Sequence, residues 1–253
     1  MGVVQGCPHL LDGGAEVMRV LVACEYSGRV RDAFINAGHD AMSCDLLETE
    51  VPGPHYKGDV REVIGRGWDL MISHPPCTYL ASSGLHWNKR VPGRALLTEQ
   101  ALEFVRLLLD APIPKIALEN PIGCISTAIR KPDQTIQPWM FGEDASKATC
   151  LWLKGLPTLC QTTQHPGMYG CQCGHRFPTQ LGKYGCPNCA GDSGPAKLVY
   201  ANQTNSGQNK LAPSVDRWKE RSRTYQGVAD AMAAQWGGVA TVAQQHDLFS
   251  EAE

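Results

Sequence analysis

The feature that most constrains the fold is a short apolar segment that stops at two prolines. Residues 68–73 read Trp-Asp-Leu-Met-Ile-Ser and are followed by His74, Pro75, Pro76 and Cys77. Such a run predicts a buried strand of a parallel sheet, because proline cannot extend a hydrogen-bonded ladder. Cys77 is therefore expected just past the carboxyl end of a strand, where open α/β sheets carry their sites. An ordinary buried thiol is the competing interpretation, since free cysteine is among the most buried residue types.

Residues 19–45 predict a helix between two parallel strands. An apolar run at 19–24 leads through a turn containing Gly28 to an amphipathic segment, and a second run at 39–44 ends on Asp45. This is the βαβ layout of nucleotide-binding folds, in which the acid binds the ribose hydroxyls. The alternative for Asp45 is a cap of the turn that follows it.

Two further candidates lie at Asp59 and in the segment after Cys77. Asp59 follows a glycine and precedes a predicted short helix, so it fits either a contact to an adenine amino group or a helix N-cap. Residues 81–90 are rich in Ser and Gly and predict an active-site loop without regular structure. His86 and Trp87 within it are interpreted either as substrate contacts or as anchors of the loop.

A second strand end is expected to deliver a carboxyl group. Thr98 is predicted to cap a helix that ends at Pro112, and the apolar run at 115–118 is followed by Glu119 and Asn120. Because parallel strands end at the same edge of a sheet, a thiol and a carboxyl group are expected to face one crevice. A thiolate can bond to an electron-poor ring carbon while a carboxyl group hydrogen-bonds the ring nitrogen that gains charge. Chemistry at C5 of cytosine requires this pairing.

These motifs resemble the DNA cytosine-5 methyltransferase family, in its compact bacterial or phage form. The Pro-Cys motif of that family resembles Pro76 and Cys77 with Ser83 in the following loop, and its Glu-Asn motif resembles Glu119 and Asn120. The resemblance implies a Rossmann-like class I methyltransferase fold, a doubly wound and mostly parallel α/β sheet. It implies Cys77 as the nucleophile and Glu119 as the group facing the ring nitrogen. Pro76, Ser83 and Asn120 are then substrate-binding residues, with Asn120 also a structural partner.

The resemblance also implies a methyl donor and a catalytic cation. The donor is S-adenosylmethionine, and the implied cofactor-binding residues follow the strand ends: Ala23, Glu25, Ser27, Gly28, Asp45, Asp59 and Ser73. Lys147 takes the place of the family's first arginine, and Thr78 stands where the family commonly has Gln. A lysine is a point charge, so it can contact a substrate but not in the bidentate manner of arginine. Methylation of an exocyclic amino group is the weaker alternative, because the two prolines lack the acidic or amide residue and the aromatic that flank them there.

Residues 159–213 lose the apolar periodicity and contain two close pairs of cysteines. The pairs are separated by residues 174–185 and can place four thiolates around one Zn²⁺, with His175 as a possible substitute for one sulfur. The four are Cys171, Cys173, Cys186 and Cys189. We predict a structural zinc ribbon, because a segment with so little apolar content has no other evident reason to fold. The resemblance places DNA recognition here; a structural plug or a protein-docking surface is the alternative.

The chain then returns to the core through a basic helix. Arg217 and Arg221 are one helical turn apart in the densest basic stretch, which predicts either a substrate-binding phosphate clamp or a solvated surface helix. An alanine-rich segment at 228–236 predicts a helix packed on the sheet. The expected organisation is a disordered leader (1–17), a methyltransferase core (18–158), the zinc-ribbon insert (159–213), the returning helix (214–238) and a polar tail (239–253).

Composition limits the classes of function. The net charge of -2 provides no global basic field, so contact with DNA must come from local clusters of cations. Eleven cysteines, an odd number, favour reduced thiols and a metal site over a disulfide framework. No apolar run approaches the roughly 20 residues that a membrane span needs, and no signal pattern begins the chain, so a cytoplasmic protein without a membrane partner is expected. The sequence leaves the oligomeric state open.

The expected function is therefore transfer of a methyl group from S-adenosylmethionine to DNA cytosine through a covalent adduct between Cys77 and C6. Two alternatives stay open. The protein could place a different group on cytosine or act on a free cytosine nucleotide, or it could be a catalytically silent DNA-binding protein with a zinc ribbon.

Overall fold

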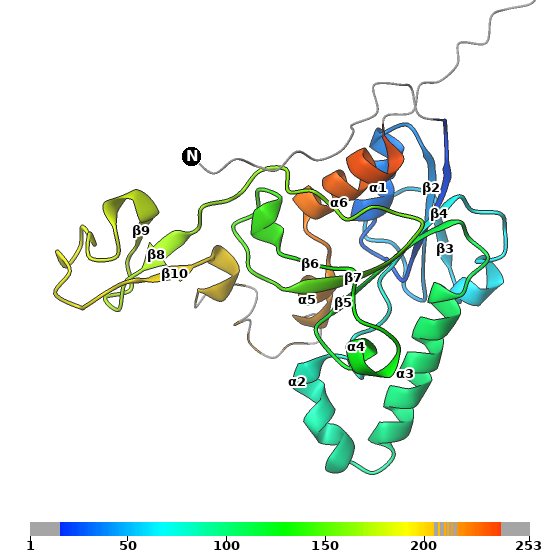
Figure 1. The fold of residues 1–253 in the computed structure, drawn as a ribbon, viewed down its shortest axis with the longest axis horizontal. Helices are drawn as coiled ribbons and strands as arrows, with labels where there is room; N and C mark the ends of the chain where they lie inside the picture. The colour runs from blue at the N-terminus through cyan, green and yellow to red at the C-terminus, as the bar shows by residue number, and fades with distance from the viewer. Residues whose placement is uncertain are drawn as a thin grey trace, which may run out of the picture.

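The chain is built around one seven-stranded sheet with the strand order β3-β2-β1-β4-β5-β7-β6 (Figure 1). The structure, a computed structural model, describes residues 16–204, 207, 210, 212, 214 and 217–238. The strands are β1 (Arg19–Ala23), β2 (Asp40–Asp45), β3 (His55–Lys57), β4 (Leu70–Ser73), β5 (Lys115–Pro121), β6 (Gln134–Ile136) and β7 (Thr149–Lys154). Strands β3, β2, β1, β4 and β5 are parallel to one another, whereas β7 is antiparallel to both β5 and β6. The prediction of a mostly parallel α/β sheet, compatible with a Rossmann-like fold, is confirmed.

The winding of the sheet reverses between β1 and β4. From β1 the chain proceeds outward to β2 and β3, and from β4 it proceeds to β5 on the other side. A crevice forms outside the carboxyl ends of the strands at such a reversal, and ligands of open α/β sheets bind there. Residues 24–28, which follow β1, and residues 74–77, which follow β4, both lie at this reversal.

Helices cover both faces of the sheet. Helix α1 (Arg29–Asn36), helix α6 (Gln226–Met232) and the π-turn η7 (Ala233–Gly237) lie on one face, and the long helix α3 (Arg94–Leu109) lies on the other (Figure 1). Alternate residues of β1 point to opposite faces, so Val20 and Val22 pack with the α1–α6 core while Leu21 packs with the α3 core. The predicted helix at 228–236 therefore packs on the sheet as expected.

The segment after Cys77 is helical, which corrects the prediction of an irregular loop at 81–90. Helix α2 (Ser82–Leu85) continues into the 3-10 helix η2 (His86–Lys89). Thr98 is not a helix cap either, because α3 begins at Arg94 after Gly93. The Thr98 hydroxyl instead donates to the carbonyl of Tyr79 at 3.1 Å and accepts from the Asn88 amide at 2.9 Å. It therefore ties α3 to the α2–η2 segment.

The remaining elements complete the core and form a separate small sheet. In the core these are η1 (Val60–Glu62), α4 (Ile125–Ala128), η3 (Pro138–Met140) and α5 (Arg217–Ser222). The insert contains β8 (Met168–Gly170), β9 (Arg176–Pro178), η4 (Thr179–Leu181), β10 (Lys197–Val199) and η5 (Ala201–Gln203). Its three strands form an antiparallel sheet in the order β10-β8-β9, which projects from the core at the left of Figure 1.

Asp144 joins the insert to the core. Its carboxylate accepts from the Arg176 guanidinium of β9 at 3.1 Å and from the Ala201 backbone N–H at 2.9 Å. Two residues further on, Ser146 exchanges hydrogen bonds with the Asn202 side chain. The position of the insert is thus fixed by the segment that also carries Lys147.

Two predictions from composition can be compared with the structure. No helix within the described residues is long and apolar enough to cross a membrane. Nine of the described cysteines are free, but Cys160 is disulfide-bonded, which corrects the expectation that all thiols are reduced. The predicted tail at 239–253 and residues 1–15 of the predicted leader lie outside the described residues.

Candidate active site and metal centre

A cavity of about 390 Å³ lies beyond the ends of β4 and β5, and most of the predicted catalytic and substrate-binding residues line it. Those residues are Pro76, Cys77, Ser83, Glu119, Asn120, Lys147 and Arg221. The walls come from five parts of the chain: the turn after β4, helix α2, the end of β5, the segment before β7 and helix α5. Groups predicted from separate stretches of sequence therefore face one space.

The turn after β4 exposes the sulfur of Cys77. Pro75 is buried while Cys77 is exposed. The carbonyl of Cys77 accepts from the backbone N–H groups of Leu80 and Ala81, which closes the turn. The Asn120 amide donates to the Pro75 carbonyl at 2.7 Å and holds the turn against β5. Because the Asn120 side chain is only 1% exposed, it serves as a clamp for the turn rather than as a surface for substrate.

A close backbone approach at Gly123 fixes the other end of this turn. The Ser82 N–H donates to the Ile122 carbonyl and the Cys124 N–H donates to the Leu80 carbonyl, each at 2.9 Å. A Cβ atom on Gly123 would lie 1.9 Å from the Leu80 carbonyl oxygen, a distance that no structure tolerates. Only glycine fits here without moving the backbone that carries Cys77.

Glu119 forms an ion pair with His74 at the floor of the cavity. Ser73 pairs with Leu118 across β4 and β5, so the next residues along each strand lie side by side. His74 Nδ1 lies 2.9 Å from Glu119 Oε2, and each side chain is 13% exposed. Burial alone would lower the pKa of His74, but the hydrogen bond and charge of Glu119 outweigh it and raise that pKa. Burial would raise the pKa of Glu119, yet His74 and Lys147 bring it below its usual value. Both shifts favour the charged forms of the pair.

Lys147 and helix α5 form the outer wall. The Lys147 ammonium donates to the Arg221 carbonyl at 3.0 Å. Helix α5 is fixed to the β1–α1 turn by the Tyr26 hydroxyl, which donates to the Lys219 carbonyl at 2.7 Å. Trp218 also lines the cavity and is half exposed, whereas Arg217 is not among the lining residues. The structure thus brings Arg221 to the site and leaves Arg217 away from it.

A second cavity, of about 230 Å³, meets the first at Pro76. Asp45 and Asp59 line it together with Cys24, Leu46 and further residues. Asp45 accepts from the Leu47 N–H at 2.9 Å, and burial raises its pKa above the ordinary value. Asp59 caps η1 by accepting from the Arg61 N–H at 2.9 Å, so the N-cap interpretation holds while its carboxylate still borders the cavity.

The other predicted cofactor residues have structural roles in this chain. Glu25 is buried and accepts from the Val30 and Arg31 N–H groups and from the Ser27 hydroxyl, so it caps helix α1. Gly28 has a φ of 74°, a conformation in which a side chain is strained, and makes the turn into α1. None of these lines the second cavity.

Two more of those predictions fall on strand ends that are closed to solvent. Ala23 and Ser73 are fully buried, and neither lines a cavity among the described residues. The Ser73 hydroxyl faces the Ala117 carbonyl at 3.5 Å. In this structure Ala23, Glu25, Ser27, Gly28 and Ser73 build the strand ends and the helix start, and their predicted contact with a cofactor stays a prediction.

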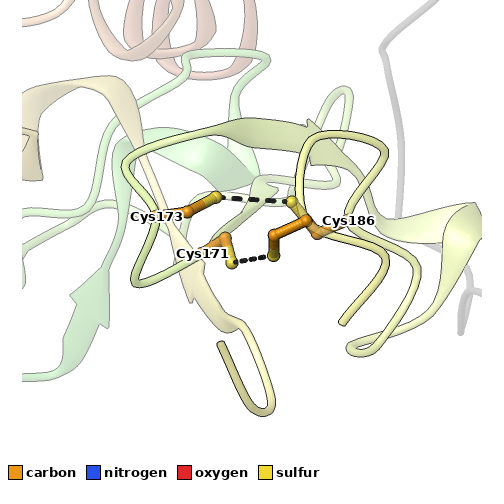
Figure 2. A group of neighbouring side chains, drawn as sticks. Cys171, Cys173 and Cys186 are labelled. Carbon is orange, nitrogen blue, oxygen red and sulfur yellow. Dashed lines mark hydrogen bonds between the residues drawn. The ribbon is translucent and has the colours of Figure 1, made fainter. Parts of the chain in front are cut away.

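The four predicted metal ligands converge in the insert. All four Sγ atoms lie within 4.8 Å of one another, with Cys171–Cys189 at 3.5 Å and Cys173–Cys186 at 3.6 Å (Figure 2). A tetrahedral Zn²⁺ with Zn–S bonds of about 2.3 Å requires sulfurs about 3.8 Å apart, so the cluster fits such an ion closely. His175 stacks on Phe177 and is outside the cluster, which answers the question of whether it replaces a sulfur.

The metal cluster is also the centre of the insert's small core. The buried residues there are Cys171, Phe177, Cys186 and Ala196, so two of the four are themselves ligands. A core of this size stabilises little by apolar burial alone, and metal binding supplies the remaining folding free energy in such modules. The four thiolates would leave no open coordination position, so the ion would be structural.

Two residues of the site were not predicted from the sequence. The partnership of His74 with Glu119 depends on strand register, which an apolar run does not reveal. Trp218 lies in the predicted basic stretch. An exposed aromatic between two cations, Arg217 and Lys219, is the signal that identifies it. The chain matches no model of a known protein family, and no curated protein is similar to it in sequence, so the geometry of these two cavities is the basis for assigning a function.

Proposed function

We propose that the protein is an S-adenosylmethionine-dependent DNA cytosine-5 methyltransferase. The observation that carries this proposal is the convergence of the Cys77 thiol, the Glu119 carboxyl group and the Lys147 ammonium on one cavity. A second cavity with two carboxylates meets it at Pro76, the residue before the thiol. A cytosine and a methyl donor held in the two cavities would meet beside Cys77.

The residues present account for each step of the reaction. The Cys77 thiolate adds to C6 of the ring, and electrons move through C5 and C4 to N3, which takes a proton from the Glu119 side of the cavity. S-adenosylmethionine, when bound, supplies the methyl group that C5 accepts. Solvent water takes the C5 proton, and departure of the Cys77 sulfur then restores the aromatic ring. Lys147 places a positive charge beside the ring on the Glu119 side.

Electrostatics at the start of α1 favour a donor without phosphates. Helix N-termini commonly bind the pyrophosphate of dinucleotides in Rossmann-like folds. Here the Glu25 carboxylate accepts from the Val30 and Arg31 N–H groups, so a phosphate would meet a negative charge in place of free donors. Asp45 and Asp59 remain for the hydroxyls and amino group of an adenosine, which supports a nucleoside-type donor.

The charges around the first cavity support a nucleic-acid substrate. Residues 70–98 contain no Asp or Glu but carry Lys89, Arg90 and Arg94 on and beside the α2–η2 segment. Helix α5 adds Arg221 on the opposite wall. Local positive charge of this kind binds phosphates even though the whole chain is slightly acidic. The insert, joined to the core through Asp144, extends this surface and is proposed to recognise the target; action on DNA in turn implies a cytoplasmic location.

A covalent trap tests the nucleophile directly. A DNA duplex with 5-fluorocytosine cannot lose its C5 substituent as a proton, so the enzyme should stay bonded to it in the presence of S-adenosylmethionine. We expect an adduct stable to denaturing electrophoresis with wild type and with Cys124→Ala, a control for a thiol outside the cavity. Cys77→Ala should give none. An adduct formed by Cys77→Ala, or the absence of any wild-type adduct, would refute the proposal.

The product separates the proposed reaction from its relatives. Plasmid DNA incubated with enzyme and donor is digested to nucleosides, whose masses are then measured. A gain of one methyl group on deoxycytidine supports the proposal, whereas another mass indicates a different transferred group. Modification of a free cytosine nucleotide in preference to plasmid would reassign the substrate.

A further inference from the structure

His74 occupies a position from which it can control the proton on Glu119. We propose that His74 is a positioning residue that supplies, through Glu119, the proton that the ring nitrogen takes. The proposal rests on the cytosine chemistry proposed above and adds to it a residue that no motif of the sequence indicated.

The geometry directs the imidazole at Glu119. The His74 backbone N–H donates to the Ala23 carbonyl at 2.9 Å, so β4 keeps its hydrogen bonding to β1 up to this residue. From there Nδ1 reaches Glu119 Oε2 at 2.9 Å. The other ring nitrogen, Nε2, is buried and has no hydrogen-bond partner among the described residues. The ring is thus committed to Glu119 through Nδ1, while no other side chain among the described residues competes for its second nitrogen.

The charges around His74 come from three other elements. Glu119 faces it from β5, Glu25 from the β1–α1 turn, and Lys147 from the segment before β7. Cys77 and Arg221 border the same cavity. The two carboxylates favour the imidazolium and the ammonium opposes it, and the net effect raises the pKa of His74 despite its burial. The raised pKa favours the protonated ring, and a protonated ring can supply a proton.

Glu119 has a second polar neighbourhood behind it. A small cavity of about 10 Å³ lies between Glu119, Lys147, Thr149, Thr224 and Tyr225. This is about the smallest space that holds one water molecule. Glu119 therefore borders the substrate cavity on one side and, on the other, a small chamber that Ile136, Pro138 and Val228 also line, and His74 is its direct ionic partner.

The proton transfers balance within the pair. When the Cys77 sulfur bonds to C6, the N3 atom gains an electron pair. The Nδ1 proton of His74 then moves to Glu119, and Glu119 passes a proton on to N3, which leaves a neutral imidazole and an ionised carboxylate. After methyl transfer and loss of the C5 proton, departure of the sulfur returns the electron pair, and the N3 proton goes back to Glu119 and His74. The pair thus ends the cycle with the proton with which it began.

The experiment measures the rate of adduct formation with a 5-fluorocytosine duplex in single turnover, from pH 6 to pH 10. In His74→Asn the side-chain amide can still donate to Glu119 but cannot release a proton. Wild-type rates should rise as the thiolate forms and fall when the pair loses its proton. In His74→Asn the fall should be absent and the neutral-pH rate about a hundredfold lower.

A double variant separates this role from simple support of the structure. If His74 acts through Glu119, adding His74→Asn to Glu119→Gln should lower the rate no further, whereas independent effects would multiply. Unchanged rates and an unchanged pH profile in His74→Asn would overturn the inference while leaving the methyltransferase proposal intact. Absence of any wild-type adduct would overturn the proposed function itself.

A spectroscopic measurement on the wild-type protein guards against a variant that does not fold. The ¹⁵N chemical shifts of the His74 ring distinguish imidazolium from neutral imidazole. Two protonated nitrogens at pH 7.5 are expected, and Glu119→Gln should convert the ring to the neutral form at that pH. A neutral ring in wild type would contradict the inference without any need for the His74 variant.

Discussion

At the scale of single residues, the site depends on which carboxylates are already used by the fold. The Glu25 carboxylate is fully used in capping α1. The Asp45 carboxylate accepts from the Leu47 N–H and also borders the second cavity. Asp59 does both, since one oxygen caps η1 while the side chain still faces the cavity. A carboxylate after a parallel strand can therefore be structural or functional, and its hydrogen-bond partners decide which.

Asp45 should be the residue on which donor affinity depends most. Asp45→Asn removes the charged acceptor for a ribose hydroxyl, and hydrogen bonds to charged groups contribute about 1.5–3 kcal/mol. We expect S-adenosylmethionine to bind about ten- to a hundredfold more weakly by isothermal titration calorimetry. Asp40→Asn is the matched control, because Asp40 starts the same strand, is exposed and lies away from the cavity. Equal affinities for the two variants would argue against a donor in this cavity.

The His74–Glu119 pair should also leave its mark on stability. The raised pKa of His74 means that its stabilising contribution is complete below pH 6.5 and is lost as the pH rises through the folded value. The lowered pKa of Glu119 means that its contribution is present above pH 4.5 and is lost as the pH falls through the folded value. The free energy of unfolding of wild type minus that of His74→Asn should thus be largest between pH 4.5 and 6.5. A difference independent of pH in denaturant titrations would contradict the ion pair.

At the scale of elements, the sequence predicted the buried strands and the polar residues that follow them. It did not predict the contacts between segments. The ends of β1, β2 and β4 lie within one residue of the predicted strand ends, whereas β5 continues through Glu119 and Asn120 to Pro121 because these residues pair with β7. The helical structure of the α2–η2 segment was not predicted, because its Ser and Gly residues favour a loop. Contacts such as the Asn88–Thr98 hydrogen bond override that preference. Register hid His74 beside Glu119, since sequence spacing carries no information about neighbouring strands.

The turn that presents Cys77 should depend on a backbone contact as much as on its own residues. Gly123→Ala puts a methyl group against the Leu80 carbonyl, and strain of this kind costs about 1–3 kcal/mol. We expect a lower melting temperature and slower adduct formation than in wild type. Gly65→Ala, at a position with no atom within 4 Å, should change neither. Normal adduct rates in Gly123→Ala would show that the turn adjusts without cost to the site.

At the scale of the whole molecule, contacts between the core and the insert lie close to the active site. Asp144 holds Arg176 and Ala201 of the insert, and Lys147 three residues later holds helix α5 through the Arg221 carbonyl. The second cavity is on the far side of Pro76 from these contacts and receives no residue of the insert. Disturbance of the insert should therefore reach the substrate side before it reaches the donor side.

Metal removal tests this order of events. A strong chelator should release one Zn²⁺ per chain and unfold the insert, because its core contains few apolar residues beside the ligands. DNA affinity, measured by fluorescence anisotropy, should then fall at least tenfold. The affinity for S-adenosylmethionine should stay within about twofold, since the second cavity keeps all its residues. Cys186→Ser should reproduce both results without a chelator, and Cys124→Ser should reproduce neither. If the metal-free protein binds DNA as tightly as before, the insert is a structural plug and the cations beside the first cavity carry recognition alone. Equal loss of donor and DNA binding would mean that the insert supports the core as a whole.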